Sequence, residues 1–130
     1  MRRRSPNPLG PLRHRKHSDL VREVLRSCNW LPGVFLFPVE VTVAQRGEVV
    51  RALGMTGTPD ILGWKTWISG PREGWPTVQK RCVPVAFEIK VGRDQLRPEQ
   101  RSFLERLRQD GGIAAEIRSV EEAVKALDAG

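Results

Sequence analysis

The sequence predicts an α/β domain in which helices flank a mixed four-stranded sheet, with the element order α-β-β-β-α-β-α. Two observations lead to this prediction. Residues 97–127 hold two helices with clear start and stop signals, on either side of a short apolar strand. Before them, an amphipathic helix is followed by three segments rich in β-branched and aromatic residues. A chain of 130 residues suits a single domain with one core.

The first half of the chain begins with a helix predicted over about 19–29, for which Ser18 is a candidate N-cap. Its apolar residues recur on one side: Leu20, Val21, Val24 and Leu25. A strand is predicted over 32–43, and Pro38 within it indicates an edge position or a bulge. Residues 44–58 are either a loop or a continuation of that strand, ending in the turn signal "GMTGTP".

The middle of the chain predicts two further strands. "DILGWKTWI" (60–68) is the second strand, and residues 84–90 are the third. Repeated glycine and proline residues between them predict that 69–82 is a connection.

The C-terminal part has the clearest local signals. Pro98 stands where the first residue of a helix is expected, and the glycine pair at 111–112 ends that helix. Residues 113–118 are the fourth strand, and a capping box from Ser119 to Glu122 opens the last helix. The helix between the third and fourth strands predicts a crossover that makes these two strands parallel.

The formal net charge of +7 is concentrated at the N-terminus. Residues 1–17 contain six basic residues and no acidic one, whereas the remainder contains 16 basic and 15 acidic residues. The sequence therefore predicts a flexible basic tail over 1–17 and a folded domain over 18–130. The tail could contact phosphates through counterion release, or it could be a solubilising terminus, and the sequence favours neither.

The composition argues against a membrane protein and a secreted one. No apolar run approaches the roughly 18 residues needed to cross a bilayer, and no apolar segment follows the basic N-terminus. Cys28 and Cys82 are far apart and form no metal-ligand pattern. We expect a cytoplasmic protein with reduced thiols.

The third predicted strand carries two charges on one face, because side chains alternate and Glu88 and Lys90 are two positions apart. If the second and third strands pair, Asp60 lies beside Glu88, and two adjacent carboxylates repel unless a cation binds them. Oxygen ligands without Cys or His clusters favour Mg²⁺ or Mn²⁺. Lys90 could orient a water or stabilise charge on a phosphate. The alternatives are a structural ion pair, an exposed strand face, or a turn role for Asp60.

Gln100 is a polar residue within the apolar stripe of the following helix. It could reach across the sheet to metal-bound waters or a phosphate, or it could lie at the solvent edge of the stripe.

These residues resemble the VRR-NUC branch of the PD-(D/E)xK nucleases. The resemblance lies in "GTPDILG" and "FEIKVGRDQLRPEQRSFLERLRQDGGIAAEIRSVEEAVKAL", and covers roughly 18–128. It implies a restriction-endonuclease-like core and metal-dependent hydrolysis of DNA. The sequence departs from the family at "FPVEV", where many small phage members have Arg and Asn, so no substrate contact is carried over to that strand.

The resemblance also implies roles for individual residues. Asp60, Glu88 and the carbonyl of Ile89 would bind the metal, Lys90 would be the catalytic lysine, and Gln100 would match the family's glutamine.

Family members often carry a further acid on the first helix. Asp19 fits that position best by its distance to Gly33, and Glu23 lies one turn further on. A solvated helix surface is the alternative for both residues.

The resemblance implies a homodimer acting on branched DNA, similar to Holliday-junction resolvases, in a bacterial cell or a phage-infected host. Nicking or flap cleavage, a catalytically silent DNA-binding module, and nucleic-acid binding by the tail alone are the alternatives. The segment 65–83 is longer than is usual in the family, and its Trp67 and Trp75 could stack on DNA or pack on the core. Eight basic residues are candidate DNA contacts: Arg13, Arg15, Lys16, Lys65, Arg72, Lys80, Arg81 and Arg93.

Overall fold

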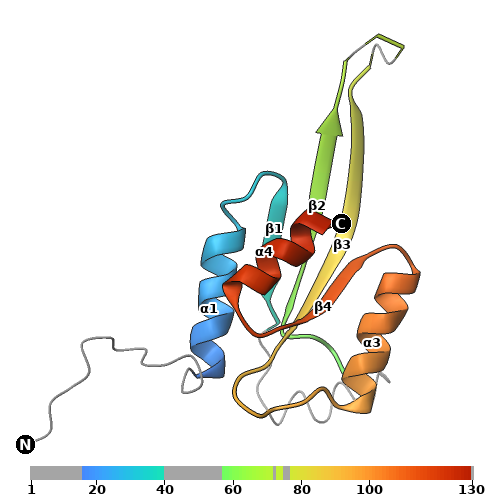
Figure 1. Cartoon of the computed structure of the whole chain (residues 1–130). Helices are drawn as coiled ribbons and strands as arrows, with labels where there is room; N and C mark the ends of the chain where they lie inside the picture. Colours follow the sequence, from blue (N-terminus) through green and yellow to red (C-terminus); the bar gives the residue numbers. More distant parts are fainter. Residues whose placement is uncertain (1–15, 40–56, 72, 75–76, 130) are drawn as a thin grey trace, which may run out of the picture.

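The computed structural model describes residues 16–39, 57–71, 73–74 and 77–129 (Figure 1). These residues form an α/β fold with the predicted element order. The three helices and four strands of this part of the chain are α1 (His17–Cys28), β1 (Val34–Pro38), β2 (Ile61–Ser69), β3 (Gln79–Ile89), α3 (Pro98–Gln109), β4 (Ile113–Ile117) and α4 (Val120–Ala129). None of the described helices is long and apolar enough to span a membrane.

The four strands form one mixed sheet in the order β1-β2-β3-β4. The pairs β1–β2 and β2–β3 are antiparallel, and β3–β4 is parallel across the α3 crossover, as predicted. β1 lies at the edge, and Pro38 is its last residue. The edge position predicted from this proline is therefore confirmed, because an edge strand tolerates a missing N–H donor.

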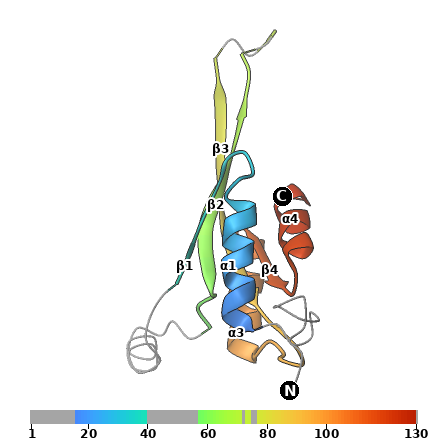
Figure 2. The same cartoon turned by 90° about the vertical axis from the view of Figure 1, so that its left-hand side faces the viewer.

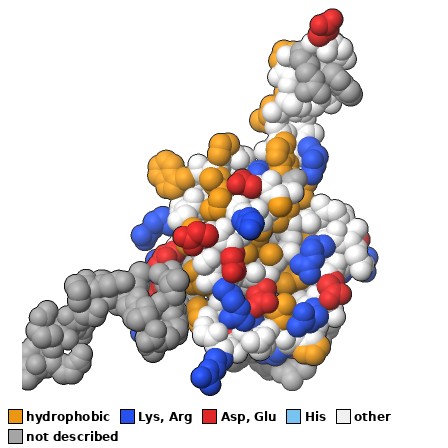
Figure 3. All heavy atoms as spheres, viewed as in Figure 1, with side chains coloured by type: hydrophobic (Ala, Val, Ile, Leu, Met, Phe, Trp, Pro, Cys, Tyr) orange, Lys and Arg blue, Asp and Glu red, His pale blue; other side chains and the backbone are white. Residues whose placement is uncertain are grey.

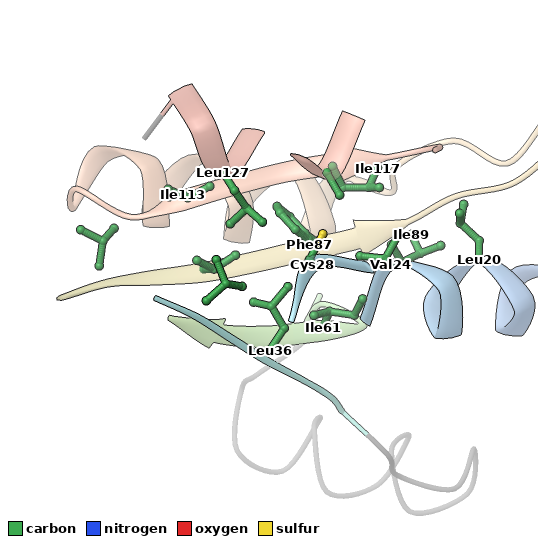
Figure 4. Close-up of a cluster of buried hydrophobic side chains, with 14 residues drawn as sticks. Leu20, Val24, Cys28, Leu36, Ile61, Phe87, Ile89, Ile113, Ile117 and Leu127 are labelled. Atoms are coloured by element: carbon green, nitrogen blue, oxygen red, sulfur yellow. The ribbon is translucent and has the colours of Figure 1, made fainter. Parts of the chain in front are cut away.

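One face of the sheet is covered by α1 and α4 (Figures 1 and 2). Alternate residues of each strand point to this face and meet the apolar stripes of both helices. Phe87, Ile89 and Ile61 are completely buried there, as are Val24 and Leu127 from the helices (Figure 4). This face contains the main hydrophobic core. Around it, basic and acidic side chains are interspersed on the visible surface (Figure 3).

The opposite face is covered differently. α3 packs over β3 and β4, where Leu104 contacts Ala86 and Ala114. The small alanine side chains let the helix approach the sheet closely. Leu62 of β2 is partly buried at the margin of this second cluster. The cover that α3 provides thus extends from β4 to β2.

The predicted connection over 69–82 is partly wrong, because β3 begins at Gln79. The pairing of β2 with β3 runs from Ile61–Phe87 to Ser69–Gln79, well beyond the ends of β1 and β4. The two strands project past the helices as a two-stranded ribbon (Figures 1 and 2). Side chains on both faces of the β3 part of the ribbon are exposed, so it has no alternating apolar pattern to reveal it.

The helix starts predicted from local sequence signals are confirmed, with one exception. Pro98 opens α3, and the Glu122 N–H donates to Ser119 Oγ at 3.1 Å, so the cap at α4 is confirmed. Ser18 is not an N-cap; α1 begins at His17, and the carbonyl of Lys16 accepts from the Asp19 and Leu20 N–H groups. The folded part therefore begins slightly earlier than predicted. Most of the predicted tail and of the 40–58 segment lies outside the described residues.

Candidate active site

The start of β2 and the end of β3 meet at one end of the sheet. Ile61 pairs with Phe87, which places Asp60 beside the last residues of β3. Asp60 Oδ2 accepts a hydrogen bond from the Ile89 N–H at 2.9 Å. Glu88 follows Phe87 on β3, so the strand register places Asp60 and Glu88 next to each other, as predicted.

Gly57 brings the turn before β2 against the first turn of α3. Its φ is +85°, and a Cβ atom here would lie 2.3 Å from the carbonyl oxygen of Glu99. Only glycine allows both this conformation and this approach. Asp60 and Gln100 are thereby held at the same end of the sheet.

Gln100 binds Glu88 through a buried hydrogen bond. Its Nε2 donates to Glu88 Oε2 at 3.0 Å, and its Oε1 accepts from the Arg97 N–H at 2.9 Å. Glu88 is 4% exposed and Gln100 is 5% exposed. The placement of Gln100 at a solvent edge is therefore wrong. Both ends of its amide are engaged, and the side chain fixes the orientation of the Glu88 carboxyl.

The other oxygen of Glu88, Oε1, has no hydrogen-bond partner, and it is the one such buried side-chain atom in the described part of the chain. Lys90 Nζ lies 3.9 Å from Oε2, at the outer limit of an ion pair. Burial, and then the charge of Asp60, raise the pKa of Glu88 to about 8. The two carboxyl groups can share a hydrogen bond only while Glu88 is protonated, so Oε1 is without a partner when both are ionised. Without a bound cation, the site therefore strongly disfavours two charged carboxylates.

His17 is the residue of this site that sequence reasoning missed. Its Nε2 lies 3.2 Å from Asp60 Oδ2, and this hydrogen bond raises the pKa of His17, although burial opposes the shift. Burial raises the pKa of Asp60, but hydrogen bonds from His17, Glu88 and the Ile89 N–H outweigh it and lower the pKa overall. The available signal was helical spacing, because His17 is three residues before the buried Leu20.

The first-helix acids lie elsewhere on α1. Asp19 accepts from Arg22 Nη1 at 3.2 Å, and this is the side-chain contact that the structure gives it among the described residues. Glu23 is half-buried one turn further along. Their roles as metal ligands stay predictions, and the α1 residue that reaches Asp60 is His17.

The donor set fits a hard divalent cation. Glu88 Oε1 is buried without a partner and Asp60 is adjacent, while the backbone of Ile89 in the same segment interacts with His17 and helps to raise the pKa of that histidine. The described residues contain no group of three or more His, Cys, Asp or Glu side chains that could hold a metal. A cation here would therefore take two carboxylates and complete its shell with backbone and water oxygens, as Mg²⁺ commonly does.

Of the basic residues predicted to contact DNA, some make contacts within the protein and others are exposed. Lys65 Nζ donates to the Leu127 carbonyl at 2.8 Å and also lies 4.6 Å from the centre of the Trp67 ring. The Arg81 guanidinium lies 4.6 Å from the same ring, and Trp67 packs against the main core. These three residues stabilise the base of the ribbon. Lys16, Lys80 and Arg93 are exposed, whereas Arg13, Arg15, Arg72 and Trp75 lie outside the described residues.

Comparison with known proteins adds no relative: no protein-family model, no curated protein and no solved structure matches the chain.

Proposed function

We propose that the chain is a metal-dependent endonuclease of the VRR-NUC type, which hydrolyses DNA phosphodiester bonds on a restriction-endonuclease-like core. The observation that carries this proposal is the pair Asp60 and Glu88, with the buried, unpartnered Oε1 of Glu88. Such a pair is unfavourable for stability, so its presence beside Lys90 favours a functional origin.

Each residue has a role that follows from its position. Asp60, Glu88 and the Ile89 carbonyl would hold Mg²⁺ or Mn²⁺. The bound cation would activate a water and stabilise negative charge on the phosphate. Gln100 keeps the Glu88 carboxyl oriented through its 3.0 Å hydrogen bond. Lys90 Nζ, beside Glu88, places a positive charge where charge develops on the phosphate.

The proposed substrate is DNA, with branched forms preferred, and the proposed setting is the cytoplasm of a bacterial cell or phage host. Three exposed basic residues can contact phosphates: Lys16 before α1, Lys80 on the ribbon and Arg93 after β3. Symmetric cleavage of a four-way junction needs two active sites, so a homodimer is part of this proposal.

A cleavage assay with matched lysine variants tests the function. Four-way junction, flap, nicked and plain duplex DNA would be incubated with Mg²⁺, Mn²⁺ or EDTA. We expect metal-dependent cleavage that Lys90→Ala reduces by at least about 100-fold, since the lysine acts on transition-state charge. Lys125→Ala is the control, because Lys125 is an exposed lysine on α4, on the other side of the sheet.

The product pattern distinguishes the remaining possibilities. Symmetric nicks in the junction support the resolvase-like activity, whereas preferred cutting of flaps or nicked duplex indicates another selectivity. Retained DNA binding with no cleavage under any metal would contradict the enzyme and indicate a silent DNA-binding module. Loss of all binding on deletion of residues 1–17, again without cleavage, would assign the binding to the tail.

A further inference from the structure

Three aromatic side chains are exposed together on the face of the sheet opposite α1 and α4. Phe35 is 51% exposed, Phe37 38% and Trp64 42%; we call these three residues the aromatic platform. The Phe35 and Trp64 ring centres are 4.8 Å apart, and those of Phe35 and Phe37 are 6.1 Å apart. The platform is one continuous aromatic surface on β1 and β2, beyond the part of the sheet that α3 covers.

The platform lies on the same face as the proposed active site. Phe37 pairs with Leu62, and Leu62 pairs with Ala86. Glu88 follows two residues later on β3, so its side chain points to the same side as Ala86. Standard spacings of about 4.8 Å between strands and 3.4 Å along them put the Phe37 and Glu88 backbones about 12 Å apart. A DNA strand cleaved at Glu88 therefore has neighbouring nucleotides within reach of the rings.

The surroundings of the platform fit a polyanion with flat apolar groups. The side chains that β1 and β2 direct to this face are uncharged, including Thr66 and Ile68. The nearest lysines by register are Lys80 and Lys90 on β3, one toward each end of the platform. Aromatic rings provide stacking surfaces for bases of any identity, while lysines contact the phosphates. Unpaired DNA bases match both features.

A second copy of the chain matches the platform less well. Aromatic side chains expose about 150–250 Å² each when free, so three rings exposed by two-fifths to one-half present about 250 Å². A stable interface needs about 800 Å² from each partner.

We propose that Phe35, Phe37 and Trp64 stack unpaired bases next to the cleaved bond, and that the protein therefore prefers DNA with a single-stranded segment beside the cut. This inference rests on the proposed nuclease function for the meaning of the neighbouring site. Bases inside a duplex already stack on one another, so a flap, a fork or an open junction centre offers the platform its ligand and plain duplex does not.

Binding measured without cleavage tests the platform. Fluorescence anisotropy in EDTA would compare a 15-nucleotide single-stranded oligothymidylate with a hairpin duplex, using wild type and the double variant Phe35→Ala/Trp64→Ala. We expect single-strand affinity to fall at least tenfold and duplex affinity to change less than twofold, because each stacked base contributes separately. The single variant Trp64→Phe, which keeps a ring, should retain most of the affinity.

Trp30→Ala is the matched control, since Trp30 is 86% exposed and follows α1, away from the platform. It should leave both affinities unchanged. Equal losses for both DNAs would overturn base stacking. Unchanged DNA binding with lower thermal stability would show that the rings are covered within the chain. Conversion of a dimer to a monomer would assign the surface to a second copy.

The two proposals fail separately. If wild type shows no metal-dependent cleavage, or Lys90→Ala cleaves as well as wild type, while the platform variant loses single-strand binding, the platform is a DNA-binding surface and the nuclease proposal is wrong. If metal-dependent cleavage is present but the platform variant binds like wild type, the nuclease stands and the platform fails.

Discussion

The two faces of the sheet differ in what they bury. Beneath α1 and α4, strand side chains such as Ile61, Phe87 and Ile89 are completely buried among apolar neighbours. On the other face, the same strands bury the carboxyl of Glu88 and expose the rings of Phe35 and Trp64. One face therefore buries apolar groups, as folding requires, whereas the other buries an ionisable carboxyl beside the small cluster under α3 and leaves aromatic rings exposed.

This difference separates stability from function. Burying apolar surface stabilises a fold by about 25 cal/mol per Å². The face beneath α1 and α4, which we call the closed face, follows this rule throughout. On the opposite face, which carries Glu88 and the aromatic platform and which we call the open face, the buried Glu88 lowers stability when it is ionised. The exposed rings also contribute less to stability than they would in a core. Features that folding does not reward are concentrated on the open face, and both proposals place DNA there.

The largest expected effect comes from removing an aromatic ring on each face. Phe87→Ala should destabilise the fold by about 3–5 kcal/mol, because it leaves a cavity in the closed core. Phe35→Ala should cost about 1 kcal/mol or less, since half of that residue is already in water. Urea denaturation followed by tryptophan fluorescence measures both values.

A milder substitution allows the same comparison to be made if the first variant does not fold. If Phe87→Ala does not fold, Phe87→Leu should still cost about 1–2 kcal/mol. A cost for Phe35→Ala equal to that of the Phe87 variant would mean that the open face is packed like a core.

The next effect concerns the pH dependence of stability in metal-free protein. The pKa of Glu88 is about 8 when folded, above its ordinary value of 4.5. The protonated Glu88 carboxyl makes its full contribution to the free energy of unfolding below pH 4.5. This contribution is lost as the pH rises toward 8 and beyond, because ionisation is harder in the folded state. Between pH 5 and 8.5, Glu88→Gln should gain about 1–3 kcal/mol of stability relative to wild type.

Urea denaturation in EDTA at the two pH values measures this difference, with Glu105→Gln as the control because Glu105 is exposed on α3. Adding Mg²⁺ at pH 8.5 should stabilise wild type more than Glu88→Gln, since a cation favours the ionised carboxyl. A pH dependence that is identical in wild type and Glu88→Gln would refute the unfavourable carboxyl pair.

The sequence predicted those parts of the fold that local chemistry determines. Pro98 and Ser119 opened helices as expected because a helix terminus satisfies its own N–H groups nearby. The strand at residues 79–82 escapes prediction because this part of the ribbon is exposed on both sides. A strand with no buried face has no reason to alternate apolar and polar residues, so periodicity does not detect it.

The site was predictable only as far as strand pairing reaches. The neighbourhood of Asp60 and Glu88 follows from the β2–β3 hairpin, and the sequence predicted it. The contact between His17 and Asp60 depends on how α1 crosses the sheet, which no spacing along the chain records. Asp19 is the first-helix acid that the resemblance favours, but it lies about 200° around the helix from His17. The partner of Gln100 likewise required the packing of α3.

The smallest effect distinguishes the two faces by thiol chemistry. Cys28 is buried on the closed face, and burial raises the pKa of its thiol to about 11. Cys82 is exposed on β3, on the side of Ala86 and thus of the open face. Ellman's reagent at pH 8 should label one thiol per folded chain, and Cys82→Ser should remove that reaction while changing stability by less than about 0.5 kcal/mol. Cys28 should react only after denaturation. Rapid reaction of both thiols in the folded protein would mean that the closed face opens readily, and its difference from the open face would not hold in solution.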